Sequence, residues 1–243
     1  MKKLLILLLA SISLSGQFKF QRSLPDRYTV LHIRGNGQSG STAIPDISYY
    51  TNTITAYNGA AISTTQQKFS NSSIYFDGSN DYFNISMNSL FNFGTGDLTV
   101  DFLVYLNSLS ALNMIVSLLN NQGISALIFY TSATTGATNF YSSSNDVSWD
   151  IVNGGSAGSL SVGQWYHVAI IRESGYFKIY IGGSLSYTSS YSSTSLAYDT
   201  SFVSQIGGRS AYSNWSNCYM QELRISKGIA RWTSNFRPPN KPY

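Results

Sequence analysis

Charge is what this sequence has least of. Asp, Glu, Lys and Arg make up only 11% of its 243 residues, whereas an average soluble domain contains about 25%. The shortage is greatest for glutamate, because the acids are nine Asp and only two Glu, Glu173 and Glu222. Low charge together with 14% aromatic residues argues against a disordered chain, and the scarcity of Glu and Lys argues against long helices and coiled coils. Ser, Thr, Tyr, Asn and Gly stand in their place, and that mixture favours strands and turns.

Cysteine and histidine are almost absent as well. Cys218 is the only cysteine, so the chain cannot form an intramolecular disulfide. His32 and His167 are too far apart in the sequence to give the ligand pair of a structural zinc site. His167 lies inside an apolar run, where a histidine more often has a structural role than that of a base. The sequence therefore predicts neither a zinc site nor a Cys–His nucleophile.

Basic residues form no compact run. The formal net charge is +4, and the basic residues near the end of the chain stand singly: Arg224, Lys227, Arg231, Arg237 and Lys241. Such spacing is typical of a solvated edge and a tail rather than of a surface for nucleic acid. We expect no nucleic-acid partner.

An apolar run opens the sequence. Lys2 and Lys3 precede an apolar stretch that reaches Leu14 and is followed by small residues, which is the layout of a secretory signal peptide. The stretch is shorter than the ~20 apolar residues that cross a bilayer, and no later run is longer. We therefore expect a signal peptide over residues 1–16, a single domain over residues 17–243, secretion to the extracellular space, and no membrane span.

Short strands separated by turns make up the rest of the chain. Apolar and polar residues alternate with period two over Leu98–Leu106 and over Tyr176–Ile181. Further runs predict strands at Tyr28–Ile33, Ser73–Phe76, Asp81–Ser86, Met114–Leu119, Ala126–Tyr130, Val147–Val152, Gln164–Arg172, Phe202–Ile206 and Tyr219–Ile225. Clusters of Gly and Asn between them are typical of hairpin turns. This pattern predicts an all-β fold in which two antiparallel sheets pack face to face.

A few segments add detail to this arrangement. Gln164–Arg172 is apolar on both faces, which predicts a strand covered on each side. Thr131–Ser144 and Leu185–Tyr198 are rich in Ser, Thr and Tyr, and we expect them to be exposed loops or edge strands. Few Lys or Glu lie along these edges to discourage pairing, so we expect association through the edges or through glycans. Only Asn88–Asn92 and Lys227–Trp232 are typical of a helical turn.

Several motifs together resemble the laminin-G-like domains of the concanavalin A-like lectin/glucanase superfamily. The resemblance covers roughly Val30–Tyr243 and implies a two-sheet antiparallel jelly-roll sandwich. It also gives His167 a structural role in a Trp-x-His-Val-Ala strand. The matching segments, in the order of the family, are Ser73–Tyr82, Gly96–Tyr105, Gln164–Ala169, Glu222–Trp232 and Phe236–Pro239.

Two positions depart from the family pattern. Gln221 stands where the family commonly has an aspartate before its Glu-Leu-Arg-Ile motif, and Leu103 stands where the family has a strand tryptophan. By alternation, we expect Gln221 to point the same way as Leu223 and Ile225. An uncharged amide would then replace a partly buried carboxylate. Neither departure threatens the fold.

Catalysis is not expected, although the superfamily includes glucanases. Those relatives place alternating acids of a Glu-x-Asp-x-x-Glu strand on one face, and the sequence has no such string. Glycoside hydrolysis usually needs two carboxylates at a defined separation. Glu173 and Glu222 are far apart in the sequence, and the resemblance makes Asp97 and Asp101 a turn residue and a polar strand position. The chain also lacks a Gly-x-Ser-x-Gly elbow and a phosphate loop. We assign no catalytic residue.

A binding site is the stronger expectation. A sugar site needs an aromatic ring for the apolar face of the sugar and a few amides or carboxylates for its hydroxyls. Tyr212, Asn214 and Trp215 offer that grouping and are our candidate ligand-binding residues. Weaker candidates are the aromatic residues Tyr141, Trp149, Tyr187 and Tyr191. The alternative, at least as strong, is that these rings cover sheet edges or pack between copies.

Calcium is a candidate cofactor, because some laminin-G-like relatives bind it at loop carboxylates and carbonyls. Asp77, Asn80 and Asp81 are the close set of oxygen donors in this sequence. In such a turn the acids more often stabilise the backbone through their own hydrogen bonds. No other cofactor is expected.

Two functions fit these observations. The first is an exported, non-catalytic carbohydrate-binding or adhesion module whose partner is a glycan or a cell-surface polysaccharide. The second is a structural surface component, such as a virion, fibre or matrix subunit, that makes protein–protein contacts in a homo-oligomer or larger assembly. The tail motif Arg-Ile-Ser-Lys-Gly-Ile-Ala-Arg is, in the resemblance, frequent in phage and environmental microbial proteins. It keeps the second function, and a location on the virion surface, open.

Overall fold

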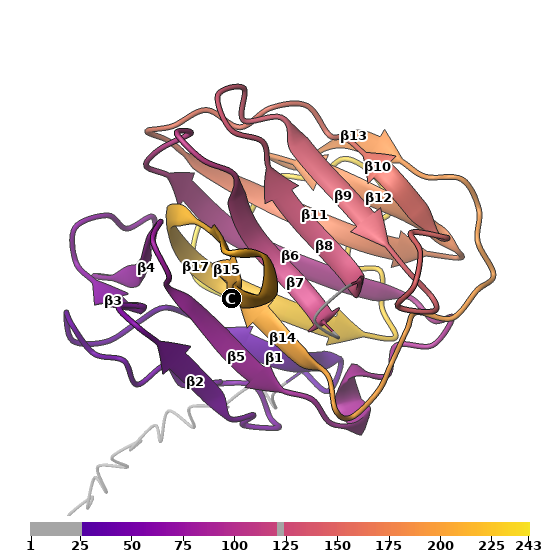
Figure 1. The fold of residues 1–243 in the computed structure, drawn as a ribbon, viewed down its shortest axis with the longest axis horizontal. Coiled ribbons are helices and arrows are strands. Elements are labelled where there is room, and N and C mark those ends of the chain that lie inside the picture. Colours follow the sequence, from indigo (N-terminus) through magenta and orange to yellow (C-terminus); the bar gives the residue numbers. More distant parts are fainter. Residues whose placement is uncertain (1–25, 121–123) are drawn as a thin grey trace, which may run out of the picture.

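Two antiparallel sheets form a jelly-roll sandwich in a computed structural model that describes residues 26–120 and 124–243 (Figure 1). The first sheet has eight strands, which are, in spatial order, β13 (Ser184–Thr188), β12 (Tyr176–Ile181), β11 (Trp165–Glu173), β6 (Leu98–Leu106), β17 (Asn217–Lys227), β4 (Ser73–Asp77) and β3 (Ala61–Ser63), with β1 (Thr29–Ile33) also paired to β17. The predicted fold class is confirmed. The expected signal peptide over residues 1–16 lies outside the described residues.

The second sheet has seven strands and lies in front of the first in Figure 1. Its strands are, in spatial order, β10 (Val152–Gly155), β9 (Thr138–Ser142), β8 (Ser125–Thr131), β7 (Asn113–Asn120), β14 (Val203–Ile206), β5 (Tyr82–Ser86) and β2 (Ile54–Tyr57). A small hairpin of β15 (Gly208–Arg209) and β16 (Asn214–Trp215) follows β14. The short 3-10 helices η1 (Ser89–Phe91) and η2 (Ser210–Tyr212) complete the described elements.

Rings from the two sheets meet in the core. Alternation along each strand turns every second side chain inward, and these side chains form one buried cluster that spans both sheets. Three phenylalanine pairs join the layers, with centroids 5.1 to 6.0 Å apart: Phe76–Phe83, Phe140–Phe177 and Phe102–Phe129. Apolar surface removed from water is the main favourable term in folding, so this interlayer cluster holds the sandwich together.

The outer face of the eight-stranded sheet is covered by the segment 228–243. Ala169, Ile171 and Tyr180 point away from the main core and form a second buried cluster, against which the tail residues Trp232 and Phe236 pack. The two tail rings stack with centroids 4.1 Å apart. The prediction that the strand at Gln164–Arg172 is covered on both faces is therefore confirmed.

Three local predictions differ from the structure. The strand expected at Val147–Val152 begins only at Val152, because the side chains of Asn145 and Asp150 accept hydrogen bonds from nearby backbone N–H groups and hold this segment as a loop. The helical turn expected at Lys227–Trp232 is absent, since β17 runs to Lys227 and a bend at Gly228 with irregular chain follows. Thr138–Ser142, expected in a loop or an edge strand, pairs on both sides. By contrast, η1 lies within the helical turn expected at Asn88–Asn92.

A bulge at Glu222 overturns the orientation expected for Gln221. The register of β17 against β6 shifts between Gln221 and Arg224, and Glu222 has a φ of 52°. Because the bulge adds one residue to the strand, Leu223 returns to the core while Gln221 points the opposite way. The buried amide of Gln221 accepts a hydrogen bond from the Lys68 backbone N–H at 2.6 Å. Its Nε2 donates to the carbonyl of Ser72 at 2.6 Å.

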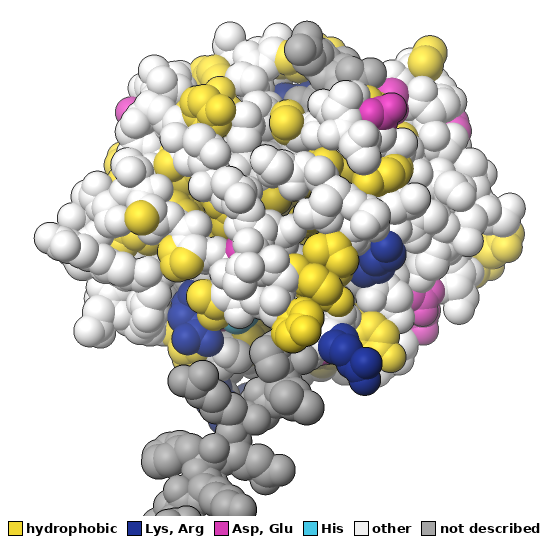
Figure 2. Space-filling model, turned by 90° about the horizontal axis from the view of Figure 1, so that it is seen from below, with side chains coloured by type: hydrophobic (Ala, Val, Ile, Leu, Met, Phe, Trp, Pro, Cys, Tyr) yellow, Lys and Arg dark blue, Asp and Glu magenta, His cyan; other side chains and the backbone are white. Residues whose placement is uncertain are grey.

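The surface reflects the low charge of the composition. Seen from below, Lys, Arg, Asp and Glu side chains are few and scattered, and most of the face is neutral (Figure 2). Within residues 26–120 and 124–243, none of the helical segments has the length and apolar character needed to cross a membrane.

Candidate ligand-binding site

An aromatic row lies on the outer face of the seven-stranded sheet. In β8 and β9, Phe129 and Phe140 point into the core, so alternation turns Tyr130 and Tyr141 outward. Their rings stack, with centroids 6.1 Å apart and an angle of 4° between planes. Trp149, from the loop before β10, packs against Tyr141 with centroids 5.2 Å apart. Three aromatic side chains thus form a continuous platform on an outer surface.

The β15–β16 hairpin stands beside this platform. Gln205 of β14 fixes its start, because its Oε1 accepts a hydrogen bond from the Ser210 backbone N–H at 3.0 Å. Ser216 fixes its end, since its hydroxyl donates to the carbonyl of Met114 in β7 at 2.7 Å. Gly208 allows the close approach of the two arms, because a Cβ there would lie 2.6 Å from the Trp215 ring. The hairpin is therefore held at a fixed place over β7.

Between the platform and the hairpin lies a hollow of about 260 Å³. Tyr130, Tyr141 and Trp149 line one side, and Arg209 and Asn214 line the hairpin side. Leu112, Met114 and Ile128 supply apolar surface. Burial, followed by the influence of Tyr141, raises the pKa of Tyr130 to about 12. Its hydroxyl therefore stays protonated and neutral near pH 7.

Of the described residues that line this hollow, Arg209 is the one that carries a charge. Its guanidinium carbon lies 4.3 Å from the centroid of the Tyr212 ring, within the range of cation–π contacts. Burial lowers the pKa of Arg209, although the nearby Tyr212 opposes the shift. A guanidinium remains protonated at any ordinary pH, so the wall of the hollow is positive.

The three principal candidate residues, Tyr212, Asn214 and Trp215, lie in different surroundings. Asn214 lines the hollow, and Tyr212 lies at its edge through its contact with Arg209. Trp215 follows Asn214 in β16 and points the other way, where its ring stacks on Tyr82 at 5.6 Å. There Trp215 contributes to a separate, small hollow of about 40 Å³. The three residues therefore do not line one common hollow.

The weaker candidates divide in the same way. Tyr141 and Trp149 line the hollow with Asn214. Tyr187, from β13, packs against the main core, and Tyr191 contacts Tyr176 at 5.5 Å between centroids.

Sequence reasoning missed Arg209 and Tyr130. Tyr130 could have been found, because alternation from Ile128 places it on the same outward face. Nothing in the sequence distinguishes Arg209 from the other arginines, since its burial depends on how the hairpin folds back over β7.

The candidate calcium residues are occupied by hydrogen bonds to the backbone. The Asp81 carboxylate accepts from the Gly59 N–H at 2.6 Å and from the Asp77 N–H at 3.0 Å. Asp77 accepts from the Ser79 N–H at 2.7 Å, and the carbonyl of Asn80 accepts from the side chain of Asn58. Among the residues that the structure describes, no group of three His, Cys, Asp or Glu is placed to hold a metal ion. These contacts match the turn-stabilising role that was the alternative for this set.

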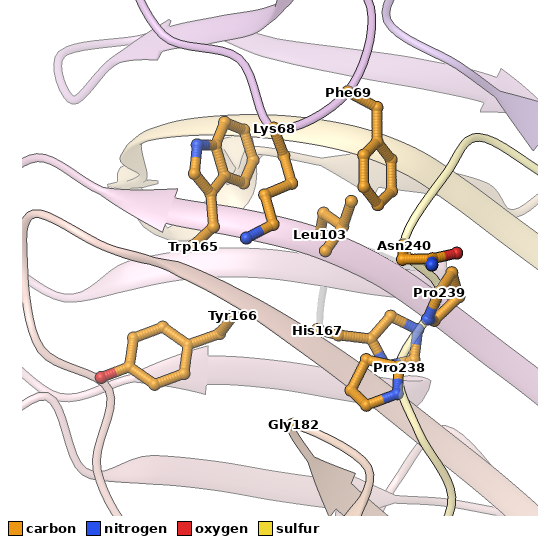
Figure 3. Close-up of a pocket in the computed structure, with 10 residues that line it drawn as sticks. All are labelled: Lys68, Phe69, Leu103, Trp165, Tyr166, His167, Gly182, Pro238, Pro239 and Asn240. Carbon is orange, nitrogen blue, oxygen red and sulfur yellow. The ribbon is translucent and has the colours of Figure 1, made fainter.

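A second, larger hollow of about 460 Å³ lies on the outer face of the eight-stranded sheet. Leu103 lies on its floor, at the position where the resemblance has a tryptophan (Figure 3). Lys68 points across it toward Trp165, while Tyr166 points away. Pro238, Pro239 and other residues of the tail and of the 66–72 loop complete the lining. A short side chain at position 103 leaves space between these two crossing segments.

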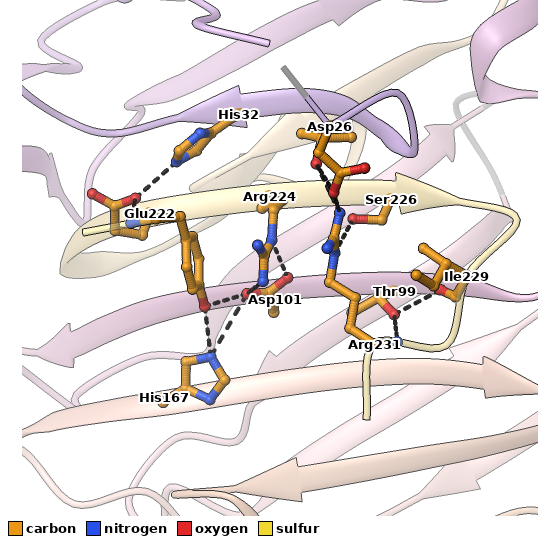
Figure 4. A network of polar contacts seen from close by, with 12 residues as sticks. Asp26, His32, Thr99, Asp101, His167, Glu222, Arg224, Ser226, Ile229 and Arg231 are labelled. Atoms are coloured by element: carbon orange, nitrogen blue, oxygen red, sulfur yellow. Dashed lines mark hydrogen bonds and ion pairs between the residues drawn. The ribbon is translucent and has the colours of Figure 1, made fainter. Parts of the chain in front are cut away.

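Buried ion pairs lie beneath the tail (Figure 4). Asp101 pairs with Arg224, and the Tyr243 hydroxyl donates a hydrogen bond to the same carboxylate. His167 Nε2 lies 2.9 Å from that hydroxyl. The Glu222 carboxylate lies 2.7 Å from His32 Nε2. Both carboxylates are almost fully buried under side chains of the protein itself.

The acids considered for catalysis all have such partners. Glu222 pairs with His32, and Asp101 pairs with Arg224. Glu173 forms an ion pair with Lys178, and Asp97 accepts a hydrogen bond from the Ser174 N–H at 2.8 Å. The described lining of the hollow on the seven-stranded sheet includes no Asp or Glu. The described residues around this hollow therefore present no carboxylate pair.

Comparison with known proteins agrees with this architecture. The laminin-G-like model of the concanavalin A-like lectin/glucanases superfamily matches residues 77–231. No curated protein matches the sequence.

Solved structures with the same fold include several toxin binding domains. The binding domain of Paraclostridial Mosquitocidal Protein 1 superposes with a TM-score of 0.62 at 15% identity, over 84% of this chain and 50% of that one. The binding domain of botulinum neurotoxin serotype C1 gives 0.61 at 12% identity, over 84% and 49%. The binding domain of botulinum neurotoxin DC in complex with SialylT gives 0.60 at 12% identity, over 84% and 48%. This chain thus spans about half the length of these structures, and at such identities the likeness concerns the fold.

Proposed function

This chain belongs to the concanavalin A-like lectin/glucanase superfamily, and on that premise we propose that it is a non-catalytic module that binds a glycan on the outer face of its seven-stranded sheet. The bound glycan would be part of a cell surface or an extracellular polysaccharide. Residues 1–16 have the layout of a secretory signal peptide, and we propose an extracellular location for that reason.

The observation that carries the proposal is the combination of the aromatic platform with polar groups on the facing hairpin. The outward rings of Tyr141 and Trp149 offer flat apolar surface to the C–H face of a sugar. Asn214 and Arg209 stand opposite and supply hydrogen-bond donors for its hydroxyls. Ligand sites generally combine apolar walls with a few well-placed polar groups in this way.

The size of the hollow fits a small part of a glycan. Sites for drug-sized molecules enclose about 300–1,000 Å³, and this hollow of about 260 Å³ lies just below that range. It therefore suits one terminal or branching sugar unit, with the rest of the chain outside. The toxin binding domains of the same fold include one solved in complex with SialylT, which supports a role in binding for this architecture.

A second candidate, a structural surface component, is favoured by the edge strand β13. Ser184, Leu185 and Ser186 are exposed there. The strand carries no charged side chain to discourage pairing with another copy. Light scattering after size exclusion would separate the two candidates. A defined oligomer that dissociates on Leu185→Lys, in a protein without glycan binding, would favour the structural role.

The test of the proposed function is a glycan array probed with the purified protein, with and without calcium. Tyr141→Ala and Trp149→Ala should each lower the binding of any positive glycan by tenfold or more, because each removes stacking surface. Tyr191→Ala is the matched control, since it removes an exposed ring that packs on Tyr176 and is not part of the described lining of the hollow. Absence of binding to every glycan, or equal binding by all three variants, would refute the proposal.

A further inference from the structure

We infer that the sugar bound in this hollow carries a carboxylate, which pairs with Arg209. The inference rests on the proposed function, because it names the chemical class of ligand for the same site. The first observation is the positive charge of Arg209, which the described part of the protein leaves without a negative partner.

Among the residues that the structure describes, the buried guanidinium of Arg209 has no counter-ion. Only 5% of the residue is exposed. In the part of the chain that the structure describes, neither Nε nor Nη2 has a hydrogen-bond partner. The aromatic face of Tyr212 covers one side of the group, but a ring face does not accept the in-plane N–H bonds of a guanidinium. A buried charge without a partner is costly. Arg209 therefore lowers the stability of the folded protein unless a bound group pairs with its charge.

The other buried arginines show how the same chain otherwise treats this group. Arg224 forms two hydrogen bonds to the carboxylate of Asp101, at 3.0 and 3.1 Å. Arg172 donates to three backbone carbonyls, those of Gly94, Ser192 and Thr194, at 2.6 to 3.0 Å. Arg209, by contrast, lines the hollow on the seven-stranded sheet. Arg209 therefore stands in the wall of a space that a ligand can enter, with its unpartnered Nε and Nη2 buried in that wall.

The residues that line the hollow favour a ligand that is both a sugar and an anion. The described lining of the hollow has no acid, and tyrosine hydroxyls are neutral near pH 7, so the charge of Arg209 makes the field inside positive. The planar fork of a guanidinium matches the two oxygens of a carboxylate. Tyr141 and Trp149 provide the stacking surface for a ring, and Asn214 lies beside Arg209 for a neighbouring hydroxyl. A uronic acid or a sialic acid combines these features.

The experiment compares matched acidic and neutral sugars by ligand-observed NMR and calorimetry. The probes are methyl β-glucuronide with methyl β-glucoside, and the methyl glycoside of N-acetylneuraminic acid with its methyl ester; glucose 6-sulfate tests whether any anion suffices. We expect one acidic probe to bind at least tenfold more tightly than its neutral partner, with a preference that weakens as salt is raised. The two pairs distinguish a uronic acid from a sialic acid.

Variants test whether Arg209 is responsible. Arg209→Gln should remove the preference for the acidic probe but retain binding of the neutral one, and Arg209→Lys should keep part of it. Arg27→Gln, which removes an exposed arginine, is the matched control and should change nothing. Arg209→Gln should leave the melting temperature equal or higher, because it removes an unpaired buried charge, and this readout shows that the variant is folded.

The experiments separate failure of the carboxylate inference from failure of the proposed function. Equal binding of acidic and neutral probes, an unchanged preference in Arg209→Gln, or equal binding of the sulfate and carboxylate probes would overturn the inference while the proposed function stands. No binding of any probe, together with a negative glycan array, would overturn the proposed function itself.

Discussion

Asp101 and Arg224 face each other across β6 and β17, joined by hydrogen bonds of 3.0 Å from Nε and 3.1 Å from Nη2. Burial by itself would raise the pKa of Asp101. The nearby His167, whose Nε2 lies 3.7 Å from Oδ2, and the charge and hydrogen bonds of Arg224 together outweigh burial and hold that pKa below its usual value. The ring of Tyr243 lies over the guanidinium, 3.6 Å from its carbon. The pair thus joins two strands of the sheet to the segment that covers them.

The first prediction concerns this pair. Asp101→Asn should lower the free energy of unfolding by about 3–5 kcal/mol at pH 7, because it leaves the charge of Arg224 buried without a counter-ion. Urea unfolding measures the change. Asp97→Asn, which affects a more exposed acid at the start of the same strand, should cost about 1 kcal/mol at most; a similar cost for both would contradict the role of the pair.

The pair also predicts how the stability of the folded protein changes at low pH. Because the pKa of Asp101 is lowered in the folded state, its stabilising effect is complete above the ordinary value of 3.8 and is lost as the pH falls through the folded pKa. The wild type should therefore lose stability steeply below about pH 3.8. Asp101→Asn should show a shallower loss over the same range.

A second prediction concerns Asp146, whose pKa is shifted in the direction opposite to that of Asp101. Burial, followed by repulsion from Asp199, raises the pKa of Asp146 to about 6. Asp146 holds its proton more tightly in the folded protein than in the unfolded chain. The stability that this protonated carboxyl contributes below about pH 4 is therefore lost as the pH rises through about 6. Asp146→Asn should remove that slope and raise the free energy of unfolding at pH 7 by about 1 kcal/mol, after allowance for solvent screening.

The neighbouring Asp150 provides the control for Asp146. Burial tends to raise its pKa, but hydrogen bonds from Ser144 outweigh burial and lower it. Asp150→Asn should therefore destabilise the protein slightly at pH 7, opposite in sign to Asp146→Asn. Thermal unfolding between pH 4 and 8 would reveal the difference, and shifts of equal sign in both variants would refute the assignment.

A third prediction uses the hollow above Leu103. Leu103→Trp should fill part of it and raise the free energy of unfolding by about 1 kcal/mol, because the added ring buries apolar surface against Trp165 and Phe69. Leu103→Ala should lower it by about 2 kcal/mol. Glycan binding should be the same in both variants as in the wild type. Loss of binding in Leu103→Trp would move the ligand site to the eight-stranded sheet.

A fourth prediction separates two tryptophans. Trp215→Ala should destabilise the protein by about 3 kcal/mol, because its ring packs on Tyr82 and supports Gly208 of the hairpin. Trp149→Ala should change stability by less than about 1 kcal/mol but should weaken glycan binding at least tenfold. Denaturant melts beside binding titrations would test this division, and equal effects of the two changes on both quantities would contradict it.

Alternation and turn residues were enough to predict most of the strands. β6, β11 and β12 lie close to their expected bounds, because each buries one or both faces and shows it in its pattern. β2 and β3 were missed, since they are short and mostly half-exposed or exposed. Such strands form because a neighbour pairs with them, and their own residues carry little signal.

The site was harder to predict because its parts come from separate strands and loops. Tyr141, Trp149 and Asn214 were candidates by residue type, but their meeting depends on the order of strands in the sheet. The bulge at Glu222 shows the same limit, since a glutamate at positive φ has no sequence signal and yet it reversed the direction of Gln221. Contacts of this kind are set by pairing between distant segments.

The covering segment 228–243 decides how the molecule can be oriented. Asp26 forms an ion pair with Arg231 of that segment, and Tyr243 lies against Arg34 and Glu222, so both ends of the described chain rest on the eight-stranded sheet. The aromatic hollow lies on the opposite side of the sandwich. A bead or a further domain joined at Tyr243 would therefore stand behind the molecule, and the hollow would face outward, free to meet a ligand on an approaching surface.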